Sequence, residues 1–201
     1  TGIGYCIPAL LGLIYFATGI NPNLHFVKPV WNGQVLRNAC VNGSSEMVAS
    51  LSAALITFLF NLTMLHYLGS NGVAAITIVL YLEYLLVAVY LGYSLGVAPV
   101  ISYNYGSQNT VRLQKLFKNS LCFVGASAII IFLVANVFAE SFAGVFAAPD
   151  SAVFNIALSG FYIFAFCFLF MGVNIFGSAL FTALSNGKIS ALIAFMRSFV
   201  F

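Results

Sequence analysis

The sequence predicts an all-α protein, a bundle of helices that crosses a membrane several times. Of its 201 residues, 62% are hydrophobic and only 5% are charged, whereas a soluble domain carries about 25% charged residues. Its apolar runs are long and continuous enough for spanning helices, which need about 20 residues each. The strands of a membrane barrel would instead alternate over about 10 residues. Phe occurs 21 times, which suits helices that face lipid tails.

Six segments have the length and composition of membrane-spanning helices. The first contains Pro8, which should kink it, and the fifth is long enough to tilt or to break near Gly160 or Gly172. The first and last segments run up to the ends of the chain, which predicts a partial chain of a longer protein. The six segments cover residues 3–20, 47–68, 72–102, 117–139, 152–184 and a run that begins near Ile189.

The connections between these segments are polar and of two kinds. Residues 68–72 and 185–188 are Gly- and Asn-containing tight turns. Residues 103–117 and 140–151 are expected to be longer loops. Residues 21–45 form a linker in which 34–45 can make a short interfacial helix, with Trp31 at the depth of the lipid headgroups.

The charged residues divide by side of the membrane. Since consecutive spans alternate in direction, connections 21–45, 103–117 and 185–188 share one side. The opposite side holds two acids and no Lys or Arg. The positive-inside rule predicts that the basic side faces the cytoplasm, in a cell (plasma or inner) membrane. The alternative is a chance distribution of the seven Lys and Arg residues. The basic side holds Lys28, Arg37, Arg112, Lys115 and Lys188, with Lys118 at its edge, and the acids opposite are Glu140 and Asp150.

A polar stripe follows the second segment. Its members are Glu46, Ser50, Thr57 and Asn61, which at about 100° per residue fall within roughly 60° of one another. Lipid would not tolerate this stripe, so it should face other helices or a wet cavity. The simpler alternative is that these groups only bond to neighbouring helices.

Glu83 lies about twelve residues into the third segment, near mid-membrane. An ionised carboxylate there costs several kcal/mol unless it is hydrated or paired. Glu83 therefore faces water, binds a cation or holds a proton, with a permanently protonated structural role as the alternative. Tyr90 lies on a similar face of this helix, while Gly92 and Gly96 form a GxxxG pair that predicts close helix packing on the other face.

The remaining candidates for chemistry are weaker. Asn174 and Ser178 share a face of the fifth segment with Cys167 and Thr182 and are candidate substrate contacts. The four cysteines and two histidines show no metal-ligand spacing, so we expect no metal site and no cofactor. No nucleophile elbow, P-loop or metalloprotease motif occurs; we therefore expect neither an enzyme nor a nucleic-acid partner.

Residues 71–109 resemble the multidrug and toxic compound extrusion (MATE) family. Members often have a Gly-rich helix end followed by a P-x6-G-A/S-x-N pattern, which here is Pro99, Gly106, Ser107 and Asn109. The stretch Asn42-Gly43-Ser44-Ser45-Glu46 is similar to the MepA-like branch of the family. So is Phe181-Thr182-Ala183-Leu184-Ser185-Asn186-Gly187-Lys188.

The resemblance implies both an architecture and an activity. MATE proteins have twelve spanning helices in two bundles, which would make residues 1–20 the last helix of the N-terminal bundle and 21–45 the cytoplasmic linker. Residues 46–201 would be a truncated C-terminal bundle, so that the chain covers roughly the sixth to eleventh helices and its partner is the missing N-terminal bundle. The family exports organic cations by antiport with H⁺ or Na⁺.

The two acidic candidates differ in what supports them. Glu46 is similar to the SSE glutamate of MepA-type proteins, whereas Glu83 matches no acidic motif of the family, so its assignment depends on its depth alone. We expect Glu46, and secondarily Glu83, to exchange a drug cation for a coupling ion.

Two other functions are compatible with such a bundle. One is a flippase of the same superfamily that moves lipid-linked or polysaccharide intermediates; the absence of a mid-membrane Lys or Arg favours cationic cargo over its phosphates. The other is a membrane scaffold that transports nothing, which would not need a mid-membrane charge.

Overall fold

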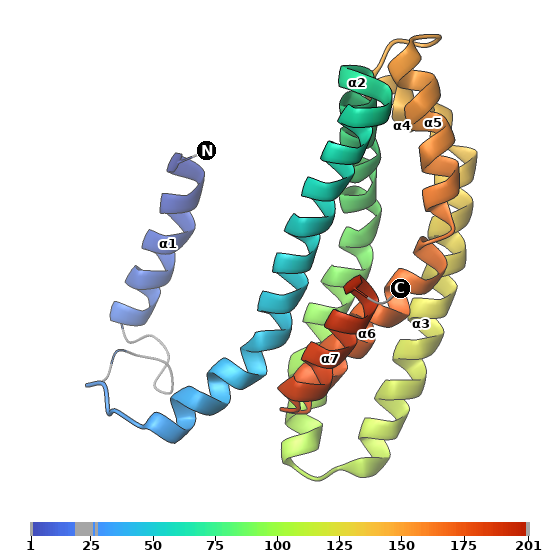
Figure 1. The fold of residues 1–201 in the computed structure, drawn as a ribbon. Coiled ribbons are helices and arrows are strands. Elements are labelled where there is room, and N and C mark those ends of the chain that lie inside the picture. The colour runs from blue at the N-terminus through green and yellow to red at the C-terminus, as the bar shows by residue number, and fades with distance from the viewer. Residues whose placement is uncertain (1, 19–25, 27, 200–201) are drawn as a thin grey trace. The chain divides into compact units, whose positions relative to one another are not determined.

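The computed structural model describes residues 2–18, 26 and 28–199, and the described residues contain helices and no strands (Figure 1). The chain divides into two units, Thr1–Arg37 and Asn38–Phe201. The predicted all-α class is confirmed. The helices are α1 (Gly2–Ala17), α2 (Gly33–Gly106), α3 (Thr110–Val137), α4 (Ala139–Phe146), α5 (Ala152–Ala165), α6 (Phe168–Ala183) and α7 (Gly187–Phe199).

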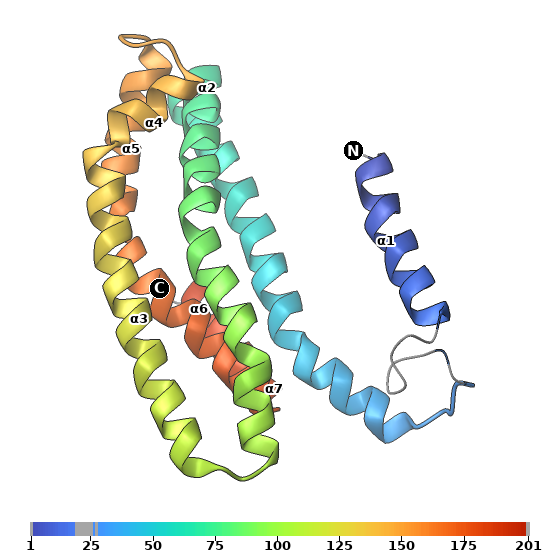
Figure 2. The ribbon, with the colours of Figure 1, turned by 180° about the vertical axis from the view of Figure 1, so that it is seen from behind.

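Helix α2 is a hairpin of two helical arms that meet at Gly69. This glycine has φ 63° and ψ −152°, a left-handed conformation that side chains with a Cβ rarely adopt. Gly72 completes the tight turn, since a Cβ there would lie 2.6 Å from Leu68 Cβ and 2.8 Å from Met64 O. The second arm therefore runs back alongside the first (Figures 1 and 2), as the turn predicted at residues 68–72 requires.

Some of the described helices are long and apolar enough to cross a membrane. By length and hydropathy, α2 and α3 each qualify, and α5 with α6 form a third candidate span that is bent by 57°. Each arm of α2 is itself longer than the roughly 20 residues that one crossing needs. Helix α1 contains Pro8, as expected, and is a shorter apolar helix.

The predicted connections are shorter than the sequence suggested. The prediction of a loop at residues 103–117 is wrong, because α2 continues to Gly106 and α3 begins at Thr110. The side chain of Asn109 caps α3 by accepting a hydrogen bond from Arg112 N at 3.1 Å. Residues 140–151 are not a loop either, since α4 occupies most of them.

Two further boundaries differ from the prediction. Residues 34–45 are helical but continue into the next span without a break, so they are not a separate short helix. The fifth segment does break, but at Phe166 and Cys167 rather than near Gly160 or Gly172. The turn at 185–188 is confirmed, with Ser185 at φ 57° between α6 and α7.

The core of the second unit forms around the second arm of α2. Buried Val79, Leu82 and Leu86 pack with Ile131 of α3 and Phe161 of α5. A smaller cluster continues toward the other end, built from Ile101, Val124, Phe176 and Ala183. At roughly 1.5–3 kcal/mol per fully buried large apolar side chain, this packing fixes the second arm against α3, α5 and α6.

The two ends of this unit differ in charge. The hydroxyl of Ser102 donates to Ala183 O at 2.9 Å, so the α2–α3 turn and the α6–α7 turn lie at one end. Arg112, Lys115 and Lys188 lie there too, in the helices that follow these turns. The α2 hairpin and the α4–α5 connection line a common cavity at the opposite end (Figure 2). The alternation that separates basic from acidic connections is therefore present within this unit.

The surface of the unit carries large apolar side chains. Examples are Leu51, Phe58, Leu95, Ile130 and Ile163, each about half exposed or more. A water-soluble monomer rarely exposes contiguous apolar patches beyond a few hundred Å², whereas lipid tolerates such a surface. The helix lengths and this surface together define a multi-pass membrane protein.

Candidate functional site

The break between α5 and α6 interrupts a span inside the unit. Around it the backbone bonds tighten to a three-residue spacing: Cys167 N donates to Phe164 O at 2.9 Å and Leu169 N to Phe166 O at 3.3 Å. A broken helix releases backbone carbonyls at membrane depth, and such carbonyls must be bonded by protein or must line a cavity. The break is therefore the first place to look for a polar site.

Tyr90 binds one of the carbonyls at the break. Its hydroxyl donates to Phe168 O at 2.9 Å, and the side chain is buried at 1% exposure. Its ring packs against Gly172 of α6, where a Cβ would lie 2.6 Å from Tyr90 Cε1 and 2.9 Å from Val124 Cγ1. Tyr90 thus joins the second arm of α2 to the start of α6.

Glu83 lies two helical turns from Tyr90 on the same arm and is half-buried. Its carboxylate is close enough to Cys167 to interact with the thiol electrostatically. Among the side chains that the structure describes, none pairs with Glu83 as a cation. A half-buried carboxylate without a cationic partner beside a broken helix can bind a proton or a small cation. The sequence placed Glu83 at mid-membrane but did not place it beside this break.

Replacing Gly172 with Ala should destabilise the packing at the break. The new Cβ would overlap the Tyr90 ring, which the Phe168 bond holds in position, and overpacking of this kind costs about 1–3 kcal/mol. Thermal unfolding in detergent measures the effect. Gly92→Ala is the matched control, since a Cβ at Gly92 meets nothing within 4 Å. Equal melting temperatures of the two variants would contradict the close packing of Gly172 against the Tyr90 ring.

The predicted GxxxG contact is absent within the described part of the chain. Added Cβ atoms at Gly92 and Gly96 meet no described atom within 4 Å, so neither glycine permits a close helix approach here. Ser94, between them, is buried and its hydroxyl has no hydrogen-bond partner among the described residues. It lies one turn beyond Tyr90 and is a further polar group on this arm.

The polar stripe on the first arm of α2 remains accessible. Glu46 and Ser50 are exposed, and Thr57 and Asn61 are half-buried. The Asn61 amide donates to Thr57 O at 2.8 Å, which satisfies its donor within the helix. The stripe is therefore not sealed in the core of the unit, and its role in binding stays a prediction.

A second polar centre is a hydroxyl cluster at the basic end, formed by Ser45, Ser178, Thr182 and Ser190. Ser190 Oγ lies 2.9 Å from Ser178 Oγ and 2.8 Å from Thr182 Oγ1, and it donates to Ser178 O at 2.7 Å. Ser45 Oγ lies 3.2 Å from Thr182 Oγ1. The cluster joins α2, α6 and α7, and it engages Ser178, the predicted substrate contact, with protein groups.

Asn42 extends this cluster toward the backbone. Its Nδ2 donates to Thr182 O at 3.3 Å, while its buried Oδ1 has no partner among the described residues. Gly187 permits the approach, because a Cβ there would overlap Val41 O and Asn42 Cα. The start of the first arm is thus held against the α6–α7 turn, next to exposed Glu46.

The structure groups some of the predicted site residues and separates others. Glu83 and Tyr90 lie together at the break, and half-buried Asn174 lies two turns further along α6. Ser178 belongs to the hydroxyl cluster instead. Sequence reasoning missed the roles of Ser45, Ser190 and Phe168. The signal for Ser190 was present, since Ser178 and Thr182 precede a tight turn and Ser190 follows it.

Metal-ligating residues do not gather in the described part of the chain, where no three His, Cys, Asp or Glu side chains lie within reach of one ion. The four cysteines are free and exposed.

The fold and these polar centres define a multi-helix membrane protein with polar groups inside its bundle. A model of the MatE family matches residues 47–201, more than half of the chain. The protein therefore belongs to the MatE family, a family of membrane transporters. No curated protein matches the chain, and no solved structure does.

Proposed function

We propose that the protein is a secondary active transporter that exports organic cations by antiport with H⁺ or Na⁺. Residues 46–201 form most of its C-terminal bundle, residues 21–45 the linker, and residues 1–20 the last helix of the N-terminal bundle. It acts in the plasma or inner membrane with the basic connections in the cytoplasm, and it belongs to the MepA-like branch.

One observation carries the proposal, the position of the Glu83 carboxylate beside the α5–α6 break. In a medium of low dielectric, the carboxylate attracts a cation far more strongly than it would in water. An organic cation and a coupling ion that compete for it cannot both bind, so the arrival of one releases the other. Movement of the two bundles relative to one another then exposes the carboxylate to each side in turn.

Glu46 gives the mechanism a second carboxylate at the basic end. It is exposed in this unit and begins the stripe of Ser50, Thr57 and Asn61. A stripe of this kind offers a cation a polar path along the first arm. The cation would then bind in succession at two carboxylates, Glu46 next to the hydroxyl cluster and Glu83 next to the break.

Transport in vesicles tests the proposal directly. The full-length protein, reconstituted into liposomes, should accumulate ethidium when an opposing H⁺ or Na⁺ gradient is imposed, and collapse of that gradient should stop accumulation. Liposomes without protein supply the background. Movement of a lipid-linked phosphate intermediate with no ethidium accumulation would overturn the proposal in favour of a flippase, and movement of neither cargo would favour a scaffold.

A further inference from the structure

A small cavity of about 210 Å³ opens at the basic end of the second unit, between α2, the start of α3 and the end of α6. This volume lies below the range of about 300–1,000 Å³ that is typical of small-molecule sites, so the cavity suits a narrow apolar segment such as part of an acyl chain. The lining side chains are apolar except for that of Gln114: Ile101, Leu113, Gln114, Phe117, Leu180 and Leu184.

The walls of this basic-end cavity are held in place by the packing beneath them. Buried Ile101 and Phe176 belong to one apolar cluster, and Leu113 and Leu180 pack against it. The ring of Phe117 stacks with that of Phe176 at a centroid distance of 6.5 Å and an interplanar angle of 29°. Phe117 is nevertheless 40% exposed, so part of this preformed apolar surface is accessible from outside the unit.

The basic side chains at this end supply counter-charge for an anionic headgroup. Arg112, Lys115, Lys118 and Lys188 are all exposed, and they outnumber Glu46, the acid at the same end. Clusters of Lys and Arg beside membrane-spanning helices attract the phosphates of anionic lipids. The cavity therefore combines an apolar lining with a surplus of positive charge nearby.

Lys118 shares the face of α3 that borders the cavity. It follows the lining residue Gln114 by four residues, so the two lie roughly 40° apart around the helix and are neighbours on its surface. Side chains of a helix lean toward its N-terminus, which for α3 is the end at the α2–α3 turn, and a lysine extends its ammonium toward the headgroups. Arg112 lies roughly 160° from Gln114, on the other side of α3.

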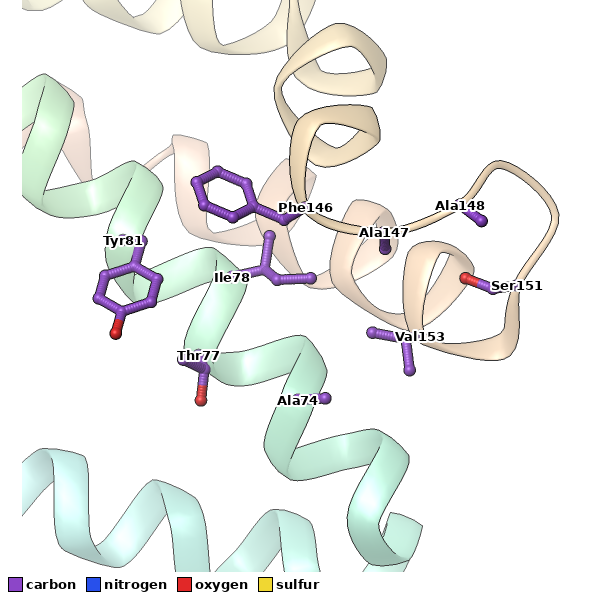
Figure 3. Close-up of a pocket in the computed structure, with 9 residues that line it drawn as sticks. All are labelled: Ala74, Thr77, Ile78, Tyr81, Phe146, Ala147, Ala148, Ser151 and Val153. Carbon is purple, nitrogen blue, oxygen red and sulfur yellow. The ribbon is translucent and has the colours of Figure 1, made fainter.

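A larger cavity at the opposite end of the unit lacks this positive charge. It has a volume of about 510 Å³ and lies between the second arm of α2 and the α4–α5 connection (Figure 3). Exposed Asp150 directly precedes its lining residue Ser151. Residues 74–81 and 146–153, which contain its lining, hold no Lys or Arg. An anionic lipid would find a counter-ion at the basic end and none beside this second cavity.

We propose that the basic-end cavity binds one anionic glycerophospholipid of the surrounding membrane. An acyl chain occupies the apolar space between α3 and α6, and the phosphate lies against the Lys118 ammonium. The lining and the charge thus recognise the two halves of the same molecule. Binding of this lipid does not depend on which cargo the protein carries.

Native mass spectrometry of the full-length protein in detergent tests the site by counting bound lipids during a titration. Phosphatidylglycerol should bind in a saturable first step, and Lys118→Gln should weaken that step about fivefold through loss of one cation near the phosphate. Arg112→Gln is the matched control, since it removes the same charge from the other side of α3 and should leave the first step nearly unchanged. Phosphatidylcholine with identical chains should bind more weakly and respond to neither substitution.

Gln114→Trp tests the place of the acyl chain. Because Gln114 is exposed at the cavity, the larger ring should fill the cavity without entering the core, and the first binding step should be lost. Glycerol phosphate, the headgroup without its chains, should not displace the bound lipid. Thermal unfolding is measured for every variant, and if Gln114→Trp does not fold, the comparison of Lys118→Gln with Arg112→Gln decides alone.

Four results would overturn the inference. Equal affinity of Lys118→Gln and Arg112→Gln for phosphatidylglycerol would indicate attraction by diffuse surface charge. Phosphatidylcholine binding as tight as that of phosphatidylglycerol would remove the role of the charge. Undiminished binding to folded Gln114→Trp would place the chain elsewhere, and displacement by glycerol phosphate would make the site one for a free anion.

Discussion

Glu83→Gln and Glu46→Gln variants are each expected to lose at least about tenfold of gradient-driven efflux of a fluorescent organic cation from cells. Glutamine keeps the size and hydrogen-bonding capacity of each side chain but removes the charge that exchanges a drug cation for a coupling ion. A factor of ten corresponds to about 1.4 kcal/mol. A single charge contact at reduced dielectric exceeds this value.

The matched control for this prediction is Glu140→Gln. Glu140 is exposed in the first turn of α4, at the end of the unit opposite the basic connections, so its neutralisation should leave efflux nearly unchanged. Protein levels in the membrane are measured for all three variants. If Glu46→Gln and Glu83→Gln both retain full, gradient-dependent efflux at normal expression, the carboxylates do not couple transport.

The sequence predicted the helical class correctly because it follows from hydropathy, whereas it placed most of α4 in a loop. Long apolar runs leave a membrane chain with helices as the way to satisfy its backbone. The turn at Gly69 was also predictable, since a Leu-Gly-Ser-Asn-Gly stretch between two apolar runs supports a reversal. These features depend on local composition alone.

The helix ends were predicted less well, for a physical reason. Hydropathy marks where the chain enters lipid, whereas a helix ends only where its backbone bonds end. Residues 103–106 and 110–117 are polar but helical, so α2 and α3 extend past the apolar region and leave a short turn at residues 107–109. The same reasoning explains why residues 34–45 continue directly into the first arm of α2.

The position of the break in the fifth segment could not be predicted from the positions of its glycines. Gly160 and Gly172 were the expected weak points, yet the helix bends at Phe166 and Cys167. Gly172 serves another purpose, since it gives space to the Tyr90 ring. At the bend, Phe168 O accepts a hydrogen bond from Tyr90, a contact between distant parts of the chain that no local pattern reveals.

The candidate site was predictable in its residues but not in its grouping. Depth alone singled out Glu83, and helical spacing singled out the stripe from Glu46 to Asn61. Spacing placed Ser178 on one face with Asn174 as a candidate substrate contact, which stays a prediction; the structure adds its contact with Ser190 across the α6–α7 turn. Polar residues on one helix face can serve a cavity or a neighbouring helix, and only the tertiary structure distinguishes the two.

Replacing Gly187 with Ala is expected to cost about 3 kcal/mol in stability, at the upper end of typical overpacking effects. The added Cβ would overlap the backbone of residues 41 and 42 and would lie 2.9 Å from Asn42 N. Backbone in a helix cannot rotate away as a side chain can. The first arm would have to move, and the Asn42 and Ser45 contacts with Thr182 would be lost.

Thermal unfolding in detergent measures this effect, with Gly177→Ala as the control. Gly177 lies inside α6, where a Cβ meets nothing within 4 Å, so alanine should raise the melting temperature slightly through its better helix propensity. Because Gly187 begins α7 at the turn, propensity gives no comparable gain there and the clash decides the sign. If Gly187→Ala and Gly177→Ala have the same melting temperature, the start of the first arm is not held against the α6–α7 turn. The structure would then not fix Glu46 beside the hydroxyl cluster.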